Sequence, residues 1–219
     1  MIVDLHMHTV LGSVDSIIKP EHLVPWARER HLDAICITEH GNAKPPEVKE
    51  LAQKLNFPIF TGLEASTEMG DLLLFGIDGY PRSLYKALDI INYVTAAGGV
   101  VIAAHPFRWD LSPKPWLGPR HNGLTVEKAC EWPIFKLVHT MEVINGWATQ
   151  EDVDFCFQVS RRLGMVGTGG SDAHTPEGIG RCVTIFEDGV ETEAALVSAL
   201  KGGRYWAEDR RQPNEKRSA

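Results

Sequence analysis

The stretch Asp4-Leu5-His6-Met7-His8-Thr9 indicates how the rest of this chain is organised. Together with the preceding Ile2-Val3, it predicts a short strand at the start of the fold. Strand side chains repeat every two residues, so His6 and His8 are expected to project to the same side where the strand ends. Two neighbouring imidazoles form half of a metal site, although an H-x-H pair also arises by chance or in a turn.

Later apolar runs end in similar polar clusters, which favours the metal site. Short apolar runs bounded by polar residues are typical of strands. Expected strands lie within residues 34–38, 57–63, 100–104, 135–144, 165–168 and 182–186, with a further strand or hairpin arm at 72–77. The polar residues at or just after the ends of these strands are His40, Glu64, His105, Glu142, Asp172 and His174. Burial of so many polar groups is costly unless a bound cation compensates for it.

Helices are expected between the strands, at residues 20–30, 46–55, 83–97, 125–131, 151–163 and 191–201. Strands that alternate with helices pair in parallel through right-handed crossovers, and about seven such units favour a closed or nearly closed α/β barrel. In barrels of this kind the catalytic face is formed by loops after the carboxyl ends of the strands. The polar clusters lie in those loops.

The composition predicts a single soluble domain over residues 1–209, followed by a polar, disordered tail at 210–219. Of the 219 residues, 43% are hydrophobic and 23% are charged, as in ordinary globular proteins. No apolar run reaches the roughly 20 residues that span a bilayer, and no basic leader precedes the first strand. We therefore expect a cytoplasmic protein with reduced cysteines and no membrane partner.

Two charge features bear on possible ligands. A formal net charge of −7 argues against general nucleic-acid binding, which needs surplus Lys and Arg. The segment 106–123 is rich in Pro, Trp and basic residues and predicts a long loop. This loop is either a cationic rim over a site or a solvated excursion anchored by Trp; the rim would consist of Arg108, Lys114, Arg120 and His121.

Six motifs in this order resemble the PHP (polymerase and histidinol phosphatase) family. They are D-L-H-M-H-T from Asp4, I-T-E-H-G from Ile37, G-L-E from Gly62, A-H-P from Ala104, E-V-I-N from Glu142 and G-S-D-A-H from Gly170. The resemblance extends from Ile2 to about Trp206. It implies a distorted seven-stranded, TIM-like (β/α)7 barrel with metal ions at the carboxyl ends of the strands, which hydrolyses phosphoesters in most members.

Carried over residue by residue, the resemblance implies three metal positions. The first would use His6, His8, Glu64 and Asp172; the second Glu64 as a bridge with His105 and Glu142; the third Asp15, His40 and His174. Asp15 is alternatively an aspartate in a surface turn. Two residues depart from the family pattern: Glu39 stands where Asp is common, and Asp71 stands where many relatives carry His.

The residue types agree with hydrolysis of phosphate esters. Imidazole and carboxylate ligands without thiolate suit two or three Zn, Mn or Fe ions. Two metals roughly 3.5–4 Å apart share a hydroxide that can attack phosphorus. We expect Glu64 to bridge the metals, His40 or His174 to assist the leaving oxygen, and Arg108 and Arg181 to bind substrate phosphate, although Arg181 is alternatively a surface ion pair.

The predicted function is therefore a metal-dependent phosphoesterase for a small phosphate monoester, a nucleotide or a short oligonucleotide. Two alternatives stay open. An amidohydrolase also begins its barrel with H-x-H, but it normally has a bridging lysine where this chain has Glu64. A non-catalytic, metal-stabilised PHP-type module would keep the ligands without turnover. The sequence leaves the oligomeric state open.

Overall fold

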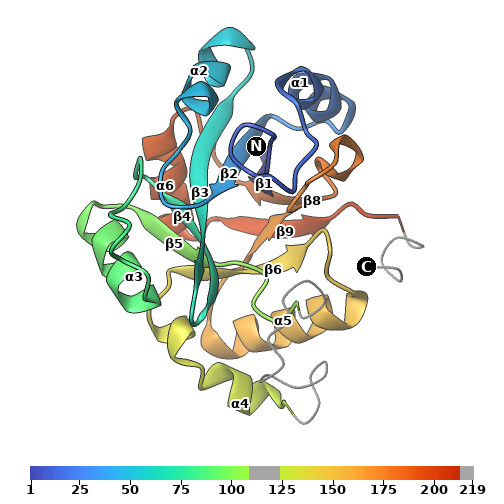
Figure 1. Ribbon diagram of the computed structural model, residues 1–219. Coiled ribbons are helices and arrows are strands. Elements are labelled where there is room, and N and C mark those ends of the chain that lie inside the picture. Colours follow the sequence, from blue (N-terminus) through green and yellow to red (C-terminus); the bar gives the residue numbers. More distant parts are fainter. Residues whose placement is uncertain (109–123, 213–219) are drawn as a thin grey trace.

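The fold is a strongly curved sheet with helices on its outside (Figure 1). The computed structural model describes residues 1–108 and 124–212. Its strands are β1 (Ile2–Met7), β2 (Ala34–His40), β3 (Ile59–Thr67), β4 (Gly70–Phe75), β5 (Val100–Ala103), β6 (Thr140–Asn145), β7 (Thr168–Gly170), β8 (Cys182–Phe186) and β9 (Tyr205–Asp209). Its α-helices are α1 (Pro20–Glu29), α2 (Pro46–Lys54), α3 (Ala87–Ala96), α4 (Val126–Cys130), α5 (Gln150–Leu163) and α6 (Glu193–Gly202).

The sheet confirms the predicted barrel-like α/β fold but has nine strands among the described residues, where the sequence predicts seven. The strand order is β7-β6-β5-β4-β3-β2-β1-β8-β9. The two ends of this order come together, because Met7 and Ala173 form a parallel bridge and the Thr184 hydroxyl donates to the Gly169 carbonyl. The barrel is therefore nearly closed.

Not all of the strands are parallel. β4 is antiparallel to both β3 and β5, and β8 is antiparallel to β1 and β9. Only residues 68 and 69 separate β3 from β4, and so short a turn cannot make the crossover that parallel strands need. The start of β4 consequently lies at the same rim of the barrel as the ends of β3 and β5.

Two apolar layers hold the barrel together. Its interior is packed by side chains of β1 to β5, including Leu5, Cys36 and Leu73, and by Leu196 and Leu200 of α6. Outside the sheet, one cluster packs α1 and α2 against β2, and another packs α3, α4 and α5 against β4, β5 and β6. All four cysteines are free, as expected.

The chain ends differently from the prediction. The sequence places the start of a disordered tail at Arg210, but Arg210 and Arg211 are held by hydrogen bonds and Arg211 is buried. The guanidinium of Arg211 donates to Asp209 Oδ1 and Oδ2 at 3.0 and 2.9 Å. Residues 213–219 of the predicted tail, and the predicted rim residues Lys114, Arg120 and His121, lie outside the described residues. None of the described helices has the length and apolar character needed to cross a membrane.

Candidate metal centre

The two histidines at the end of β1 are fully buried and turn into the barrel. The pairing of β1 with β2 changes register between Asp4 and Met7, where β1 has an extra residue. Such a bulge re-aims the side chains that follow it and often lies beside a functional site. His6 and His8 then approach each other, with 3.2 Å between their Nε2 atoms, as the alternation of strand side chains predicts.

Four buried side chains form the first group: His6, His8, Glu64 and Asp172. His6 Nε2 lies 3.3 Å from Glu64 Oε2 and 3.5 Å from Asp172 Oδ1. His8 Nε2 lies 3.2 Å from the same two oxygens. Four ligands at about 2.0–2.1 Å from a tetrahedral ion would stand about 3.3–3.4 Å apart, so these separations suit such an ion.

The hydrogen bonds of the first group also favour a metal ion. Among the described residues no donor is directed at the buried Asp172 Oδ1 with hydrogen-bond geometry. Buried polar atoms normally have a partner, and a cation would supply one here. Two neutral imidazoles that face each other through Nε2 also need a cation or a proton between them.

Glu64 connects the first group to two others. Its Oε1 lies 3.0 Å from His105 Nε2, whereas its Oε2 lies 3.1 Å from His40 Nδ1. Asp71, Glu64 and His105 together form a second possible ligand group, and His6, His105 and Glu142 form another. The bridging place that the sequence assigns to Glu64 is therefore compatible with the structure.

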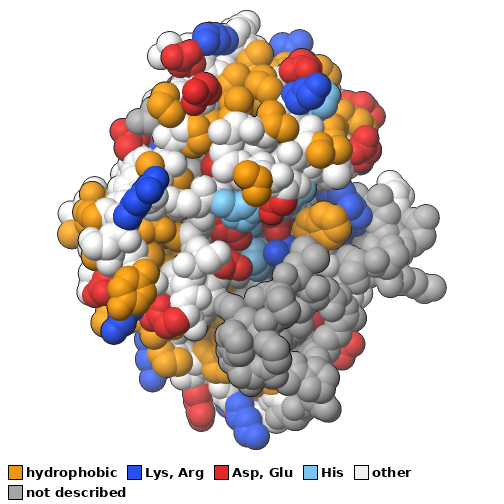
Figure 2. All heavy atoms as spheres, in the orientation of Figure 1, with side chains coloured by type: hydrophobic (Ala, Val, Ile, Leu, Met, Phe, Trp, Pro, Cys, Tyr) orange, Lys and Arg blue, Asp and Glu red, His pale blue; other side chains and the backbone are white. Residues whose placement is uncertain are grey.

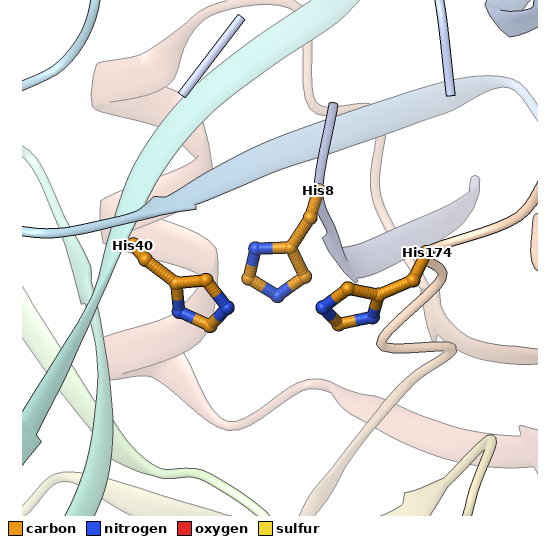
Figure 3. A group of neighbouring side chains, drawn as sticks. All are labelled: His8, His40 and His174. Atoms are coloured by element: carbon orange, nitrogen blue, oxygen red, sulfur yellow. The ribbon is translucent and has the colours of Figure 1, made fainter. Parts of the chain in front are cut away.

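The third predicted group also comes together, at the mouth of the barrel. Asp15 Oδ2 lies 3.4 Å from Nε2 of both His40 and His174. Figure 3 shows the rings of His40 and His174 on either side of His8, and their centroids lie 4.2 and 4.4 Å from that of His8. Asp15 is 55% exposed and His40 is 38% exposed, so this group faces solvent. Figure 2 shows histidine and acidic side chains together in a hollow on this face.

Charge is balanced within the cluster by protons on the histidines. Burial lowers the pKa of His6, but the charges of Asp172 and Glu64 outweigh it and raise this pKa well above its ordinary value. Burial also opposes protonation of His8, yet the close carboxylates of Asp172 and Glu64 raise its pKa to about 9. Burial raises the pKa of Glu64, but the charge of His6 and a hydrogen bond from His105 hold it well below its usual range. Glu64 is thus kept ionised and His6 and His8 are kept cationic, a charge balance that divalent ions would replace.

Tight backbone geometry sets the positions of these side chains. His105 and Asp172 have φ angles of +28° and +50°, a region that non-glycine residues seldom occupy outside functional sites. A Cβ on Gly170 would stand 2.5 Å from both Glu142 Oε1 and His6 Cβ. Glycine at position 170 is therefore needed for Glu142 to reach His6.

Three residues support the ligands, and the sequence singles out only Glu39 among them. Ser13 Oγ lies 3.1 Å from His8 Nδ1 and donates to Glu39 Oε2 at 2.5 Å. The carboxylate of Glu39 also accepts the backbone N–H and the hydroxyl of Thr9. Asn145 Nδ2 donates to Glu142 Oε2 at 2.9 Å. Asn145 was detectable as the last residue of the E-V-I-N motif, whereas Ser13 lies in a loop without any such signal.

Of the two predicted substrate-binding arginines, Arg108 reaches the cluster. Its Nη1 donates to Asp172 Oδ2 and, at 2.9 Å, to Asn145 Oδ1. Arg181 precedes β8, where its backbone N–H donates to Gly178 and its carbonyl accepts from Arg210. A role for Arg181 toward substrate stays a prediction.

Comparison with solved structures finds the same fold in several proteins. PsfC from Pseudomonas syringae PB-5123 is 18% identical with a TM-score of 0.64, covering 99% of this chain and 93% of its own. A two-domain Bacteroides vulgatus protein with a predicted PHP-like metal-dependent phosphoesterase is 23% identical with a TM-score of 0.63; the match covers 95% of this chain but 64% of that protein. An amidohydrolase from Chromobacterium violaceum, solved with bound sulfate and no metal, is 16% identical with a TM-score of 0.59, covering 80% of this chain and 88% of its own.

Comparison with protein families agrees with the geometry. A model described as PHP-associated matches residues 156–205. The model of the PHP domain matches residues 4–145, which include the H-x-H pair, Glu64, His105 and Glu142. Because that match covers well over half of the sequence, this chain belongs to the PHP domain family.

Proposed function

We propose that this protein is a metal-dependent phosphoesterase that hydrolyses a small phosphate monoester, a nucleotide or a short oligonucleotide. The observation that carries the proposal is the buried first group, in which nitrogens of His6 and His8 lie 3.2–3.5 Å from each other and from oxygens of Glu64 and Asp172. Similar proteins are described as PHP-like metal-dependent phosphoesterases, which favours the same chemistry.

The three groups would hold two or three divalent ions such as Zn, Mn or Fe. Bound there, the ions would lower the pKa of water for attack on phosphorus and stabilise charge on the phosphoryl oxygens. The chain itself supplies the geometry: Glu64 joins the first group to the other two through its separate oxygens. A substitution of Glu64 should therefore weaken metal binding at more than one of the proposed metal positions.

The substrate would enter from the mouth of the barrel, where His40 and His174 are partly exposed. Burial lowers the pKa of His40, but a hydrogen bond to Glu64 outweighs it and raises the pKa. Burial and the charge of His8 lower the pKa of His174. When no ion occupies the third group, His40 would therefore be the better proton donor of these two imidazoles for a leaving oxygen.

Arg108 would contact the phosphate of the substrate. Its guanidinium lies among Asp172, Asn145 and His105, within 3.3 Å of His105 Nε2. A cation at this place favours an anionic substrate on a protein with a formal net charge of −7. The sulfate bound by the Chromobacterium violaceum neighbour shows that a protein of this fold can hold a tetrahedral anion.

The alternative of an amide hydrolase rests on the same neighbour, which is described as an amidohydrolase. Rates on chromogenic phosphoesters, amides and lactones, measured with added Mn or Zn, separate the two functions. We expect metal-dependent release from the phosphoester alone. Hydrolysis of amides or lactones would favour the amidohydrolase. No hydrolysis of any of these compounds, together with a melting temperature that falls on chelation, would indicate the non-catalytic, metal-stabilised module.

A further inference from the structure

Glu142, which the family resemblance makes a ligand of the second metal, is committed to hydrogen bonds instead. Its Oε1 lies 3.2 Å from His6 Nδ1. Its Oε2 accepts the backbone N–H of His105 and the amide of Asn145, each at 2.9 Å. The side chain of Glu142 is only 1% exposed, so these protein groups, rather than water, satisfy its oxygens. Glu142 is placed to hold His6 and His105 rather than to bind an ion.

The protonation of His6 supports this role. A neutral imidazole has one N–H and one free nitrogen lone pair. Because Nε2 of His6 faces the first group, its proton belongs on Nδ1, where Glu142 accepts it. A carboxylate in this position fixes the tautomer and orientation of a ligand histidine. An ion held by His6 and Glu142 together would instead require a ring that has lost both protons.

Asp71 is the carboxylate that faces the second position. In the β3–β4 pair, Glu64 lies opposite Leu73 and Asp71 lies opposite Ser66. Residues opposite each other share a face, so Asp71 is the diagonal neighbour of Glu64 on the face that lines the barrel interior. The carbonyl of Asp71 also accepts the backbone N–H of Ala104 at 2.9 Å, which places Asp71 next to His105.

The donor atoms of Asp71, Glu64 and His105 meet at one place. The three ligand atoms lie within 4.8 Å of one another, and Glu64 Oε1 is 3.0 Å from His105 Nε2. We infer that Asp71, Glu64 and His105 form the second metal position of this chain and that Glu142 is a positioning residue. This inference rests on the proposed metal-dependent function and deepens it.

The ligand set has a chemical consequence. Two carboxylates and one imidazole make a harder site than one with an additional imidazole, and hard oxygen ligands suit Mn²⁺. Asp71 is partly exposed, unlike Glu64 and His105, so this position opens toward the mouth of the barrel. The second position should therefore bind Mn²⁺ better, relative to Zn²⁺, than the same position with a histidine at residue 71, and it leaves coordination places free for substrate oxygens.

Metal stoichiometry tests the inference without reference to turnover. Wild-type protein, Asp71→Asn, Asp71→His and Glu142→Gln are stripped with chelator, titrated with Mn²⁺ by calorimetry, and checked by elemental analysis. Glu50→Gln is the control, because Glu50 is an exposed carboxylate on α2 that pairs with Lys54. We expect Asp71→Asn to bind one Mn²⁺ fewer than wild type. Glu142→Gln should bind the wild-type number with affinity weakened roughly 10- to 100-fold.

The remaining outcomes are equally distinct. Asp71→His should bind the wild-type number of ions but with a higher ratio of Zn²⁺ to Mn²⁺ affinity than wild type, and it keeps the test possible should the Asn variant not fold. Full Mn²⁺ stoichiometry at wild-type affinity in Asp71→Asn would overturn the inference, as would loss of one ion in Glu142→Gln alone. Wild-type protein that binds no metal would instead overturn the proposed function itself.

Discussion

Glu64 Oε1 lies 3.0 Å from Nε2 of His105. This contact joins the end of β3 to the residue pair that follows β5, across the antiparallel strand β4. The other oxygen of Glu64 faces His6, His8 and His40. A single carboxylate thus links three sets of ligands that are far apart in the sequence.

Substitution of Gly170 should damage the centre through sterics. In Gly170→Ala the new Cβ would stand 2.5 Å from Glu142 Oε1 and from His6 Cβ, both of which are buried. We expect a loss of about 1–3 kcal/mol in unfolding free energy, together with weaker metal binding. Urea denaturation and calorimetric titration with Mn²⁺ measure the two effects.

The control is Gly202→Ala in α6, where nothing lies within 4 Å of the added methyl. Alanine favours helix over glycine by up to about 1 kcal/mol, so this variant should be as stable as wild type or slightly more stable. Equal behaviour of the two variants would contradict the steric argument at Gly170.

Metal binding should release protons at neutral pH. The pKa of His8 is raised to about 9, so its imidazole is protonated at pH 7 in the metal-free protein and must lose that proton to bind a metal. Metal affinity should therefore rise with pH toward 9. Calorimetric titrations at pH 7 in buffers of different ionisation enthalpy should give different apparent heats; identical heats would mean that no proton is released.

The raised pKa of His8 also makes the stability of the metal-free protein depend on pH. The folded-state pKa of His8 lies above the ordinary value of 6.5, so protonation favours the folded state. This contribution is fully present below pH 6.5 and is lost as the pH rises through about 9. With chelator present, the melting temperature should fall between pH 7 and pH 9.5, and His8→Gln should remove part of that fall.

Arg108 should affect substrate binding without affecting metal content. Its guanidinium, in a side chain that is 10% exposed, contacts Asp172 and Asn145, and we propose that it binds the phosphate of the substrate. Loss of a charged hydrogen bond of about 1.5–3 kcal/mol should lower kcat/KM roughly 10- to 100-fold in Arg108→Ala. Steady-state kinetics on a chromogenic phosphoester, with elemental analysis of each preparation, measure both quantities.

Arg204→Ala is the matched control, because Arg204 forms an exposed ion pair with Asp188 away from the cluster. Its kinetics should match wild type. If Arg108→Ala lost metal while Arg204→Ala did not, Arg108 would support the ligands rather than the substrate.

Arg211 should be required for stability although it lies close to the end of the described chain. Its side chain is buried and holds both oxygens of Asp209, and it also donates to the carbonyl of Ala148. Arg211→Ala removes a buried charge partner of Asp209 and a donor to Ala148, so we expect a loss of about 3–5 kcal/mol in unfolding free energy. Urea denaturation beside Arg204→Ala checks this; equal midpoints would place Arg211 outside the folded core.

Much of the centre could be predicted because its residues follow apolar runs in a fixed order. His6 and His8 end β1, His40 ends β2, and Glu64 lies in β3, so a parallel arrangement brings them to one rim. The bulge in β1 was not visible in the sequence, because its only sign is a change of register against β2. It nevertheless decides which side chains enter the barrel.

The antiparallel strands β4 and β9 explain why the sequence did not predict the place of Asp71 or the last strand. Asp71 is the second residue of β4, and a residue near the start of a parallel strand would lie at the opposite end of the barrel. The reversed direction of β4 returns Asp71 to the ligand rim. β9 was not expected, because Tyr205 to Asp209 is a short edge segment in a polar region and is defined by its pairing with β8.

The metal content of Glu64→Ala tests the central claim most directly. Wild-type protein and the variant are reconstituted with Mn²⁺ or Zn²⁺, freed of excess ions by gel filtration and measured by elemental analysis, with circular dichroism to confirm folding. We predict at least two ions per wild-type chain and a loss of more than one in Glu64→Ala, because the two oxygens of Glu64 face different ligand groups. A folded Glu64→Ala protein with the full wild-type metal content would contradict the account.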